Sequence, residues 1–534
     1  MPAYDYQLLI KQLLLTPISN KSPRKIVYGD RRYSYPEFRG RVGKLGSALT
    51  KLGVQRGETV AVMDWDSNRY LECYFAIPML GAVLQTVNVR LSPEQVTYCL
   101  NHAEAKTLIC NLEFLPLYEQ IRADLTSVER IVWISEAGVL PEGIGGAGEY
   151  EDFIAEGDPE HAFPDFDENT RATLFYTTGT TGLPKGVSFT HRQLVLHTLV
   201  TSGTFCFSQE EVYLPITPMF HVHAWGMPYV ATMNGCQQVY PGRYLPDNLL
   251  RLIREEKATF SHCVPTILQM LLSAPSSQDT DLRGLRMVIG GSALPRALCE
   301  AALARGINIF AGYGMSETCP ILTVAQIHPD QVESKDEEIV TRTRAGQVVP
   351  LVDLRIVDPD MHDVPDDGTT AGEVVVRTPW LTQAYYKDEA ATEALWAGGY
   401  LHTQDVGVVT PKGYLHITDR IKDVIKTGGE WVSSVDLESI ISQHPGVAEV
   451  AVIGLPDSKW GERPAAIVVT RAGSSVAESD IKDQVLRHAE SGVVSKYAVP
   501  EHVFFVSEIP KTSVGKLNKK SLRQSYTVES AGKV

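Results

Sequence analysis

The strongest structural signal in the chain is the segment Tyr176-Thr177-Thr178-Gly179-Thr180-Thr181-Gly182-Leu183-Pro184-Lys185-Gly186-Val187. The β-prone run 172–176 leads into it and a second short run, 187–189, follows, so the segment joins two expected strands. Its glycines let backbone amides turn towards an anion, its threonine hydroxyls donate hydrogen bonds, and its lysine supplies positive charge. We therefore predict that this loop holds phosphates.

The loop differs from a Walker A loop, which has four residues between its glycines and a serine or threonine after its lysine. Here Thr180 and Thr181 alone separate Gly179 from Gly182, and Gly186 follows Lys185. A flexible polar linker is the other interpretation of a segment rich in glycine and threonine, but linkers are seldom flanked by strands.

The bulk composition restricts the partners. The chain has 534 residues, with 49 basic and 64 acidic side chains and a net charge of −15. This length exceeds what one core supports, so we expect a large region and a smaller module. No basic excess is available to neutralise the phosphates of nucleic acid or of an anionic membrane, so we expect neither as the main partner.

The chain shows no sign of a secreted or membrane protein. Its eight cysteines are scattered, without zinc-ligand spacing, and read as reduced, mostly buried thiols. The N-terminus lacks a basic region followed by a cleavage site, and the longest apolar stretch, 74–84, is too short to span a bilayer. We expect a cytoplasmic protein with no membrane span.

Alternating strand-like and helical runs predict an α/β fold with mostly parallel sheets. Up to residue 110 we expect strands at 59–63, 86–89 and 107–110, with helices at 70–83 and 93–102. Further on, the runs 285–289 and 307–310 end in the glycine loops 290–292 and 312–314. Strand ends that open into glycine loops are where an open α/β sheet binds its ligand.

Two further regions differ in character. Between 346 and 418 short β runs and turn residues predict a small β-barrel-like subdomain. After Arg420 we expect an α+β unit with helices at 435–443 and 478–490 and strands at 447–453, 465–470 and 502–507.

A second candidate motif is Gly312-Tyr313-Gly314-Met315-Ser316-Glu317-Thr318. Tyr313 could stack on a base, the Glu317 carboxylate could bind Mg²⁺ through oxygen, and Thr318 could donate to a phosphate. An acidic helix cap after a strand is the alternative for this motif when it is taken alone.

Five motifs occur in the order typical of one family: TTGTTGLPKG (177–186), GYGMSET (312–318), TQD (403–405), DRIK (419–422) and PKTSVGK (510–516). Over about residues 30–525 the chain resembles the adenylate-forming superfamily, which includes acyl-CoA synthetases, peptide-synthetase adenylation domains and luciferases. The resemblance implies a two-step reaction. A carboxylic acid and ATP form an acyl-adenylate and pyrophosphate, and the acyl group then passes to a thiol.

The resemblance also implies roles for these motifs. The loop 177–186 would hold the β,γ-phosphates of ATP, Glu317 would bind Mg²⁺, and Thr318 would lie beside them as a catalytic residue. Tyr313 would help to frame the adenine, and Asp405 and Arg420 would hold the ribose hydroxyls. The implied nucleotide-binding set is Thr177, Thr178, Gly179, Thr180, Thr181, Gly182, Lys185, Gly291, Ser292, Ala293, Gly312, Tyr313, Gly314, Asp405 and Arg420.

By the same resemblance, residues 1–420 would bind ATP and the acid, and residues 421–534 would form a mobile lid. Lys516 would bridge the carboxylate and the α-phosphate, where negative charge accumulates. Lys422 would be the hinge. Lys426 and the turn Gly428-Gly429 would face the site only in the second, thioester-forming arrangement.

Two positions match family residues that contact CoA, namely Arg90 and Trp460. A helix-capping arginine and a packing tryptophan are the structural alternatives. The segment 220–226 carries no acid, although peptide-synthetase domains place an aspartate there to hold an α-amino group. An α-amino acid is therefore not the expected substrate.

The acyl pocket should be apolar. Its expected walls are Trp225, Met227, Val230, Val264, Gly290, Gly291, Met315, Cys319 and Pro320, with His221 near the entrance or in the core. These residues predict an acid with an apolar tail, of short to medium length. The segment around Trp225 and the pair Cys319-Pro320 resemble the bacterial methylmercaptopropionate-CoA ligases, and this resemblance implies 3-methylmercaptopropionate as one candidate. The expected reaction is that of an AMP-forming acyl-CoA ligase, and the family resemblance implies a homodimer. The alternatives are a fatty acyl-AMP ligase that loads a carrier protein and a luciferase-like oxygenase of the adenylate.

Overall fold

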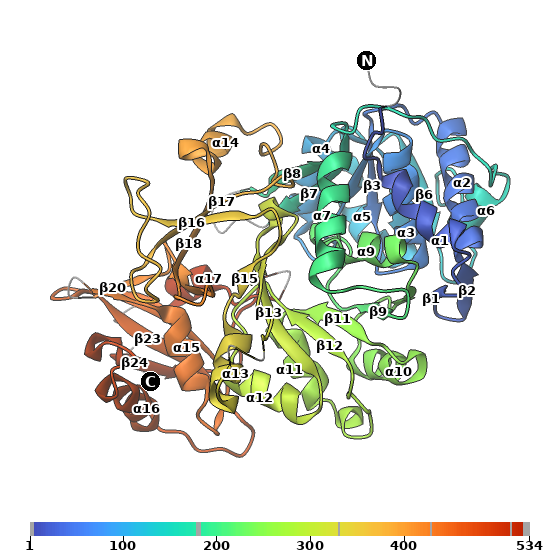
Figure 1. Cartoon of the computed structure of the whole chain (residues 1–534). Coiled ribbons are helices and arrows are strands. Elements are labelled where there is room, and N and C mark those ends of the chain that lie inside the picture. The colour runs from blue at the N-terminus through green and yellow to red at the C-terminus, as the bar shows by residue number, and fades with distance from the viewer. Residues whose placement is uncertain are drawn as a thin grey trace.

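The computed structural model describes residues 5–177, 183–328, 330, 332–427, 430–512 and 515–526. Two large sheets make up the N-terminal region (Figure 1). The first has six strands, of which the first five run parallel and the last is antiparallel. Their order in space is β6 (Arg130–Ile134), β5 (Ala105–Asn111), β3 (Thr59–Met63), β4 (Val83–Thr86), β7 (Arg171–Thr177) and β8 (Lys185–Thr190).

The second large sheet has nine strands with a parallel centre and antiparallel edges. The order is β15 (Gln347–Val348), β14 (Ile321–Val324), β13 (Asn308–Gly314), β12 (Arg286–Ile289), β11 (Phe260–Cys263), β9 (Val212–Pro215), β10 (Gln237–Tyr240), β1 (Lys25–Tyr28) and β2 (Arg31–Ser34).

One hydrophobic core joins the facing sides of these two sheets and includes the helices between them. Helix α3 is buried along its whole length, and α7 begins with a capping box in which Thr190 and Gln193 bond each other's backbone amides. A second core lies under α4 and α5 on the other side of the six-stranded sheet. The helices of this region are α1 (Leu15–Ser19), α2 (Tyr35–Lys51), α3 (Asn68–Met79), α4 (Pro93–His102), α5 (Leu115–Ile121), α6 (Tyr150–Ala155), α7 (His191–Thr204), α8 (Val222–Trp225), α9 (Met227–Asn234), α10 (Pro246–Glu256), α11 (Pro265–Ser273), α12 (Arg296–Ala304) and α13 (Lys335–Thr343).

The region after residue 350 forms a separate antiparallel sheet of four strands. We expected a small barrel here, but the sheet is open, with β16 and β19 at its edges. Its strands are β16 (Asp353–Val357), β17 (Gly372–Arg377), β18 (Leu401–Val409) and β19 (Leu415–Arg420), and α14 (Glu389–Leu395) lies between β17 and β18 in the chain.

The C-terminal unit, which we call the lid, has its own sheet and two small cores. Figure 1 shows it in orange and red, at the opposite end of the molecule from the blue N-terminal elements. Our expected boundary at 420/421 falls between β19 and the first lid strand. The lid elements are β20 (Ile425–Thr427), β21 (Glu430–Val432), α15 (Ser434–Ser442), β22 (Val447–Asp457), β23 (Gly461–Thr470), α16 (Glu478–Glu490), β24 (His502–Phe505) and α17 (Lys519–Ser525).

The mostly parallel α/β architecture is confirmed, with local differences. The helix expected at 70–83 ends at Met79, because Gly81 takes a left-handed φ of 77°, and the next strand therefore starts earlier, at Val83. The segment 312–314, expected as a loop, belongs to β13 because it pairs with β14.

The cysteines and helices agree with the composition. Every cysteine is a free thiol, and all but Cys206 are buried. Within the described ranges, none of the helices combines the length and the apolar character needed to cross a bilayer.

Candidate active site

Strands of two different sheets place a tyrosine, an aspartate and an arginine together. Asp405 on β18 pairs directly with Arg420 on β19, and the Arg420 Nε lies 3.3 Å from Asp405 Oδ1. The Tyr313 hydroxyl, from the end of β13, donates to Asp405 Oδ2 at 2.8 Å. Burial raises the pKa of Asp405, although Arg420 opposes this shift. The arrangement offers a carboxylate and a guanidinium side by side next to an aromatic ring.

The lid inserts Lys516 at this corner. A Cβ atom on Gly291 would lie only 3.0 Å from Lys516 Cε, and the Thr266 hydroxyl donates to the Gly515 carbonyl at 3.2 Å. Burial and the charge of Arg420 lower the pKa of Lys516 to about 8, against the opposing effect of Asp405 and Glu317. Residues that lie far apart in the sequence, from Thr266 to Lys516, therefore meet at one cation.

Glu317 lies next to the strand that follows the phosphate loop. Its Oε1 accepts a hydrogen bond from the Tyr385 hydroxyl at 2.6 Å, and Lys185 Nζ lies 4.6 Å from the centre of the Tyr385 ring. Thr382 donates its amide to the Glu317 carbonyl and its hydroxyl to Ser188. Burial raises the pKa of Glu317.

The donor set around Glu317 fits a hard cation. Tyr385 holds Oε1, and the backbone amide of Glu317 also hydrogen-bonds the carboxylate, which opposes the effect of burial on its pKa. Mg²⁺ in nucleotide sites takes one or two carboxylate oxygens and completes its shell with phosphate and water oxygens. Thr318 is different, because its hydroxyl already bonds to Met315 and Pro320 inside the turn.

An apolar cavity opens beside Lys516 and encloses about 600 Å³ of empty space, part of it open to solvent. The nucleotide end of this cavity includes Gly290, Gly291, Met315 and Lys516. The other end, which we call the tail region, runs beneath α7 towards β11 and β12. It is lined by Thr201, Phe205, Val222, Trp225, Met227, Phe260, His262, Val288 and Ile321.

Trp225 points into this cavity from an unusual turn. Val222, His223, Ala224 and Trp225 all have φ between 46° and 58°, so α8 is a left-handed turn, and Gly226 follows at 72°. Left-handed residues with a Cβ cost about 1–2 kcal/mol each, so packing must hold them. The buried His223 ring supplies some of that packing, at 5.2 Å from the ring of Phe175.

The Trp225 ring packs against His262 at a tilt of 33°, with 4.9 Å between ring centroids, and its Cη2 would lie 3.0 Å from a Cβ on Gly290. The sequence left the direction of this side chain open, and the structure resolves it. The indole is therefore part of the cavity wall, between His262 and Gly290.

His221 lies at the cavity on the side of Lys516. Burial, with the charges of Lys516 and Arg90, lowers the pKa of His221 to about 3, so the imidazole is neutral at pH 7. Arg90 is exposed and lies over the Phe220 ring at 5.7 Å. Trp460 sits at the tip of the β22–β23 hairpin and packs on Tyr497 at 5.4 Å.

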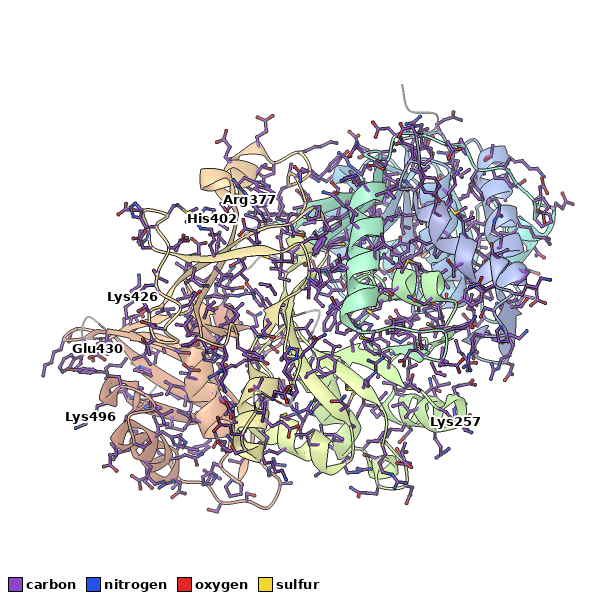
Figure 2. All side chains as sticks on the ribbon, in the orientation of Figure 1. Lys257, Arg377, His402, Lys426, Glu430 and Lys496 are labelled. Atoms are coloured by element: carbon purple, nitrogen blue, oxygen red, sulfur yellow. The ribbon has the colours of Figure 1, made fainter. Side chains whose placement is uncertain are left out.

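Of the two lid lysines predicted to serve the site, Lys516 and Lys426, the lid presents Lys516. Lys426 on β20 is exposed, and Figure 2 shows it at the outer edge of the lid, together with Glu430 and Lys496. Burial lowers the pKa of the expected hinge, Lys422, which follows β19. Lys516 therefore lies at the cavity while Lys426 lies away from it.

Hydrogen bonds also hold the lid across the expected domain boundary. The buried Asp419 on β19 accepts from both the amide and the hydroxyl of Ser434, at 2.7 and 2.6 Å. Ser433 donates its hydroxyl to the Thr418 carbonyl. Lys519, from the helix after the Lys516 loop, donates to Ser434 at 2.6 Å.

Other predicted site residues have mixed outcomes. Thr177 pairs with Lys185 across β7 and β8, Gly312 and Gly314 line the cavity near Tyr313, and Pro320 lines it as expected. Val230 is fully buried in α9 and does not line the cavity, and Ser292 and Ala293 are exposed in a bend after β12. Thr178, Gly179, Thr180, Thr181, Gly182, Gly428 and Gly429 lie outside the described residues.

Sequence reasoning missed several residues that the fold brings to the site. Tyr385, Thr266 and Ser434 belong to none of the quoted motifs. His262 lies on β11 and Thr201 on α7, and both residues are buried. Their sequences suggest a core position and give no sign of a site. Only the pairing of the segment 382–386 with β8 identifies Tyr385.

Comparisons with known proteins agree with this geometry. The family described as AMP-binding enzyme matches residues 18–386, and the family described as AMP-binding enzyme C-terminal domain matches 436–516. The long-chain-fatty-acid–CoA ligase of Thermus thermophilus is 42% identical over 503 residues, covering 93% of this chain and 90% of the relative. The 3-methylmercaptopropionyl-CoA ligase of Ruegeria lacuscaerulensis is 38% identical over 502 residues, covering 93% and 92%.

A solved structure agrees over the full length. The anthranilate CoA ligase AuaEII in complex with anthranoyl-AMP superimposes with a TM-score of 0.87 at 27% identity and covers 99% of both chains. The family match extends over well more than half of the chain and contains the tyrosine, the glutamate and the lysine of β8 described above. The chain therefore belongs to the AMP-binding enzymes of the adenylate-forming superfamily.

Proposed function

We propose that the protein is an AMP-forming acyl-CoA ligase for short- to medium-chain acids with largely apolar tails, with 3-methylmercaptopropionate as one candidate. The observation that carries this proposal is the meeting of Lys516, Asp405 and Arg420 at the mouth of an apolar cavity. The names of both relatives support CoA as the acyl acceptor. The 3-methylmercaptopropionyl-CoA ligase also supports a short acid, whereas the Thermus thermophilus relative is named for long-chain fatty acids.

In the first half-reaction, the carboxylate attacks the α-phosphorus of ATP and pyrophosphate leaves. Lys516 would donate to both the carboxylate and the α-phosphate, and its charge counts most where negative charge accumulates in the transition state. Asp405 would accept from a ribose hydroxyl while Arg420 keeps the carboxylate ionised and oriented. Lys185 and the loop before it would hold the departing phosphates.

We propose Mg²⁺ as the metal partner of ATP, with Glu317 as its protein ligand. The bound cation would neutralise phosphate charge. Tyr385 would hold one carboxylate oxygen so that the other faces the nucleotide. A buried carboxylate that Tyr385 orients supports this assignment.

In the second half-reaction, the thiol of CoA attacks the acyl carbon and AMP leaves. We propose that the lid, residues 421–534, rotates about Lys422 and brings Lys426 and the turn 428–429 to the site in place of Lys516. Arg90 and Trp460 would then contact CoA. The exposed Arg90 guanidinium near His221 and the position of Trp460 at a hairpin tip support these roles.

The alternatives differ in the acceptor of the acyl group. A fatty acyl-AMP ligase would transfer it to a carrier protein, and a luciferase-like enzyme would oxidise the adenylate. A panel of acids incubated with ATP and CoA, scored for thioester by mass spectrometry, separates them. We expect CoA thioester, and acid-dependent AMP release that does not require CoA would overturn the ligase proposal.

We also propose a cellular location and an oligomeric state. Eight free thiols support a reducing, cytoplasmic location. The family resemblance supports a homodimer, which light scattering at working concentration would test.

A further inference from the structure

We propose that the hydroxyl of Thr201 is a specificity-determining contact that binds a hydrogen-bond acceptor atom in the tail of a short carboxylic acid. The proposal rests on the acyl-CoA ligase function and refines its substrate class. It concerns one of the two polar side chains, Thr201 and His262, in a tail region that is otherwise apolar.

Thr201 lies on the last turn of α7 and lines the tail region with only 1% of its surface exposed. Its neighbours in the cavity wall are Phe205, at the C-cap of the same helix, and Phe260 on β11. Both phenylalanines are buried. A hydroxyl in such surroundings is costly unless it forms a hydrogen bond.

The hydroxyl of Thr201 does not donate to the carbonyl of the preceding helical turn, as threonine hydroxyls in helices often do. Thr198, one turn earlier, donates to the Leu194 carbonyl at 2.7 Å, the common bond back to the preceding turn. Thr201 Oγ1 instead lies 3.4 Å from Nε2 of His197. That distance is long for a hydrogen bond, and the described residues offer Thr201 Oγ1 no other one.

The state of His197 decides which way the Thr201 hydrogen points. His197 is fully buried, and burial, with the charge of His223, lowers its pKa to about 3, so the ring carries one hydrogen. Nδ1 has no hydrogen-bond partner among the described residues. An unpaired buried N–H is rarer than an unpaired acceptor, so the hydrogen belongs on Nε2.

With that tautomer, Nε2–H donates to Thr201 Oγ1, and the threonine keeps its own hydrogen for a different acceptor. Gly226 fixes the imidazole, because a Cβ at that position would lie 2.8 Å from His197 Nδ1. The histidine thus acts as a positioning residue behind the cavity wall, and the hydroxyl is left to donate into the cavity.

No other polar side chain of the tail region competes for this role among the described residues. His262 also lines it, but its Nε2 pairs with the Tyr213 hydroxyl at 2.9 Å and its Nδ1 with Thr217 at 3.0 Å. The ring of His262 therefore offers only its face, which Trp225 covers.

The class of acid that fits has an ether oxygen or a thioether sulfur in an otherwise alkyl tail. Such atoms accept a hydrogen bond and bring no donor of their own that would need a partner. Oxygen is the stronger acceptor, and sulfur the weaker one. Three acids of the same length form a matched series: pentanoate, 3-methoxypropionate and 3-methylmercaptopropionate, which carry CH₂, O and S at the same position.

The test is the ratio of kcat/KM for 3-methoxypropionate to that for pentanoate, measured as CoA thioester formation by the full-length enzyme. We expect Thr201→Val, which has the same shape without the hydroxyl, to lower this ratio about 5 to 10-fold, the value of one hydrogen bond. For 3-methylmercaptopropionate the ratio should fall less. Thr201→Ser should restore the ratio, which a purely structural role of the residue would not predict.

Thr198→Val is the matched control, because it removes a buried hydroxyl of the same helix that bonds only to backbone. Its ratio should equal that of the wild type. Should Thr201→Val fail to fold, Thr201→Ala gives the same comparison. An unchanged ratio in the valine or alanine variant overturns the inference while leaving the ligase function intact, whereas absence of any CoA thioester from the wild type overturns the function itself.

Discussion

Two lysines of the lid, Lys516 and Lys426, experience opposite environments. Lys516 meets Gly291 and the Asp405–Arg420 pair, and its pKa falls to about 8 through burial and the charge of Arg420. Lys426 lies exposed on β20, where its amide donates to Glu462. In this position of the lid, Lys516 is shielded from solvent and Lys426 is exposed to it.

This difference shows how one small domain can serve two steps. A charge acts strongly where water is excluded and weakly where it is solvated. Electrostatic stabilisation from the lid is therefore available to only one half-reaction at a time. Measurements that treat the half-reactions separately should give opposite results for the two lysines.

The largest expected effect is that of Lys516→Ala on adenylation. Loss of this cation should slow ATP–pyrophosphate exchange about 10² to 10³-fold, the scale seen when a transition-state donor is removed. Thioester formation from supplied acyl-adenylate should continue at near the wild-type rate. Normal exchange in this variant would show that Lys516 has no catalytic role.

Lys426→Ala should act in the reverse sense. Exchange should be unchanged, because Lys426 is exposed in the present arrangement. Single-turnover transfer from acyl-adenylate to CoA should slow about 10 to 100-fold, which corresponds to one hydrogen bond from a charged donor. Equal slowing of both steps would contradict the two-face interpretation.

The pH profile sharpens the comparison. Lys516 is charged below its pKa of about 8 and loses its charge above it. We expect kcat/KM for exchange to fall about tenfold per pH unit above pH 8, as one essential proton is lost. The rate of acyl transfer to the CoA thiol should instead increase in that range, because a free thiol ionises near pH 8.5.

Lys516→Arg is the matched control for the pH profile, because a guanidinium stays protonated throughout. Its exchange activity, whatever its level, should show no break near pH 8. A break that persists in this variant would assign the titration to another group.

The smallest effect concerns Tyr385, which holds Glu317. Tyr385→Phe keeps the ring under Lys185 and removes only the hydroxyl, so exchange should fall about 3 to 10-fold. Binding of Mn²⁺ in the presence of ATP, followed by electron paramagnetic resonance, should weaken in parallel. Lowered exchange with unchanged Mn²⁺ binding would show that the hydroxyl does not serve the metal carboxylate.

Much of the fold was predictable because its signals are local. The bounds of α4 and α16 follow from period and capping residues, and both match the expectation. The strand at 86–89 was misplaced because it depended on where the preceding helix ended, and Gly81 ends that helix early.

The site was predictable where residues stand within motifs, as Tyr313, Asp405 and Arg420 do. It was not predictable where tertiary packing alone supplies the contact. Tyr385 reaches Glu317 only because residues 382–386 pair with β8, and Thr201 of α7 lines one cavity with residues of β11 and β12 that are distant in the sequence. Neither the spacing of residues in the sequence nor the composition reveals which distant segments pack together.

The left-handed turn 222–225 has a consequence for how substrate range could change over evolution. A glycine at any of these positions would relieve a backbone penalty of about 1–2 kcal/mol, yet the turn carries valine, histidine, alanine and tryptophan. A substitution in this turn could therefore change the substrate range without changing the size of any side chain that lines the cavity. A substitution that changes only the backbone preference would re-aim Trp225, so the range of accepted acids could shift through main-chain conformation alone.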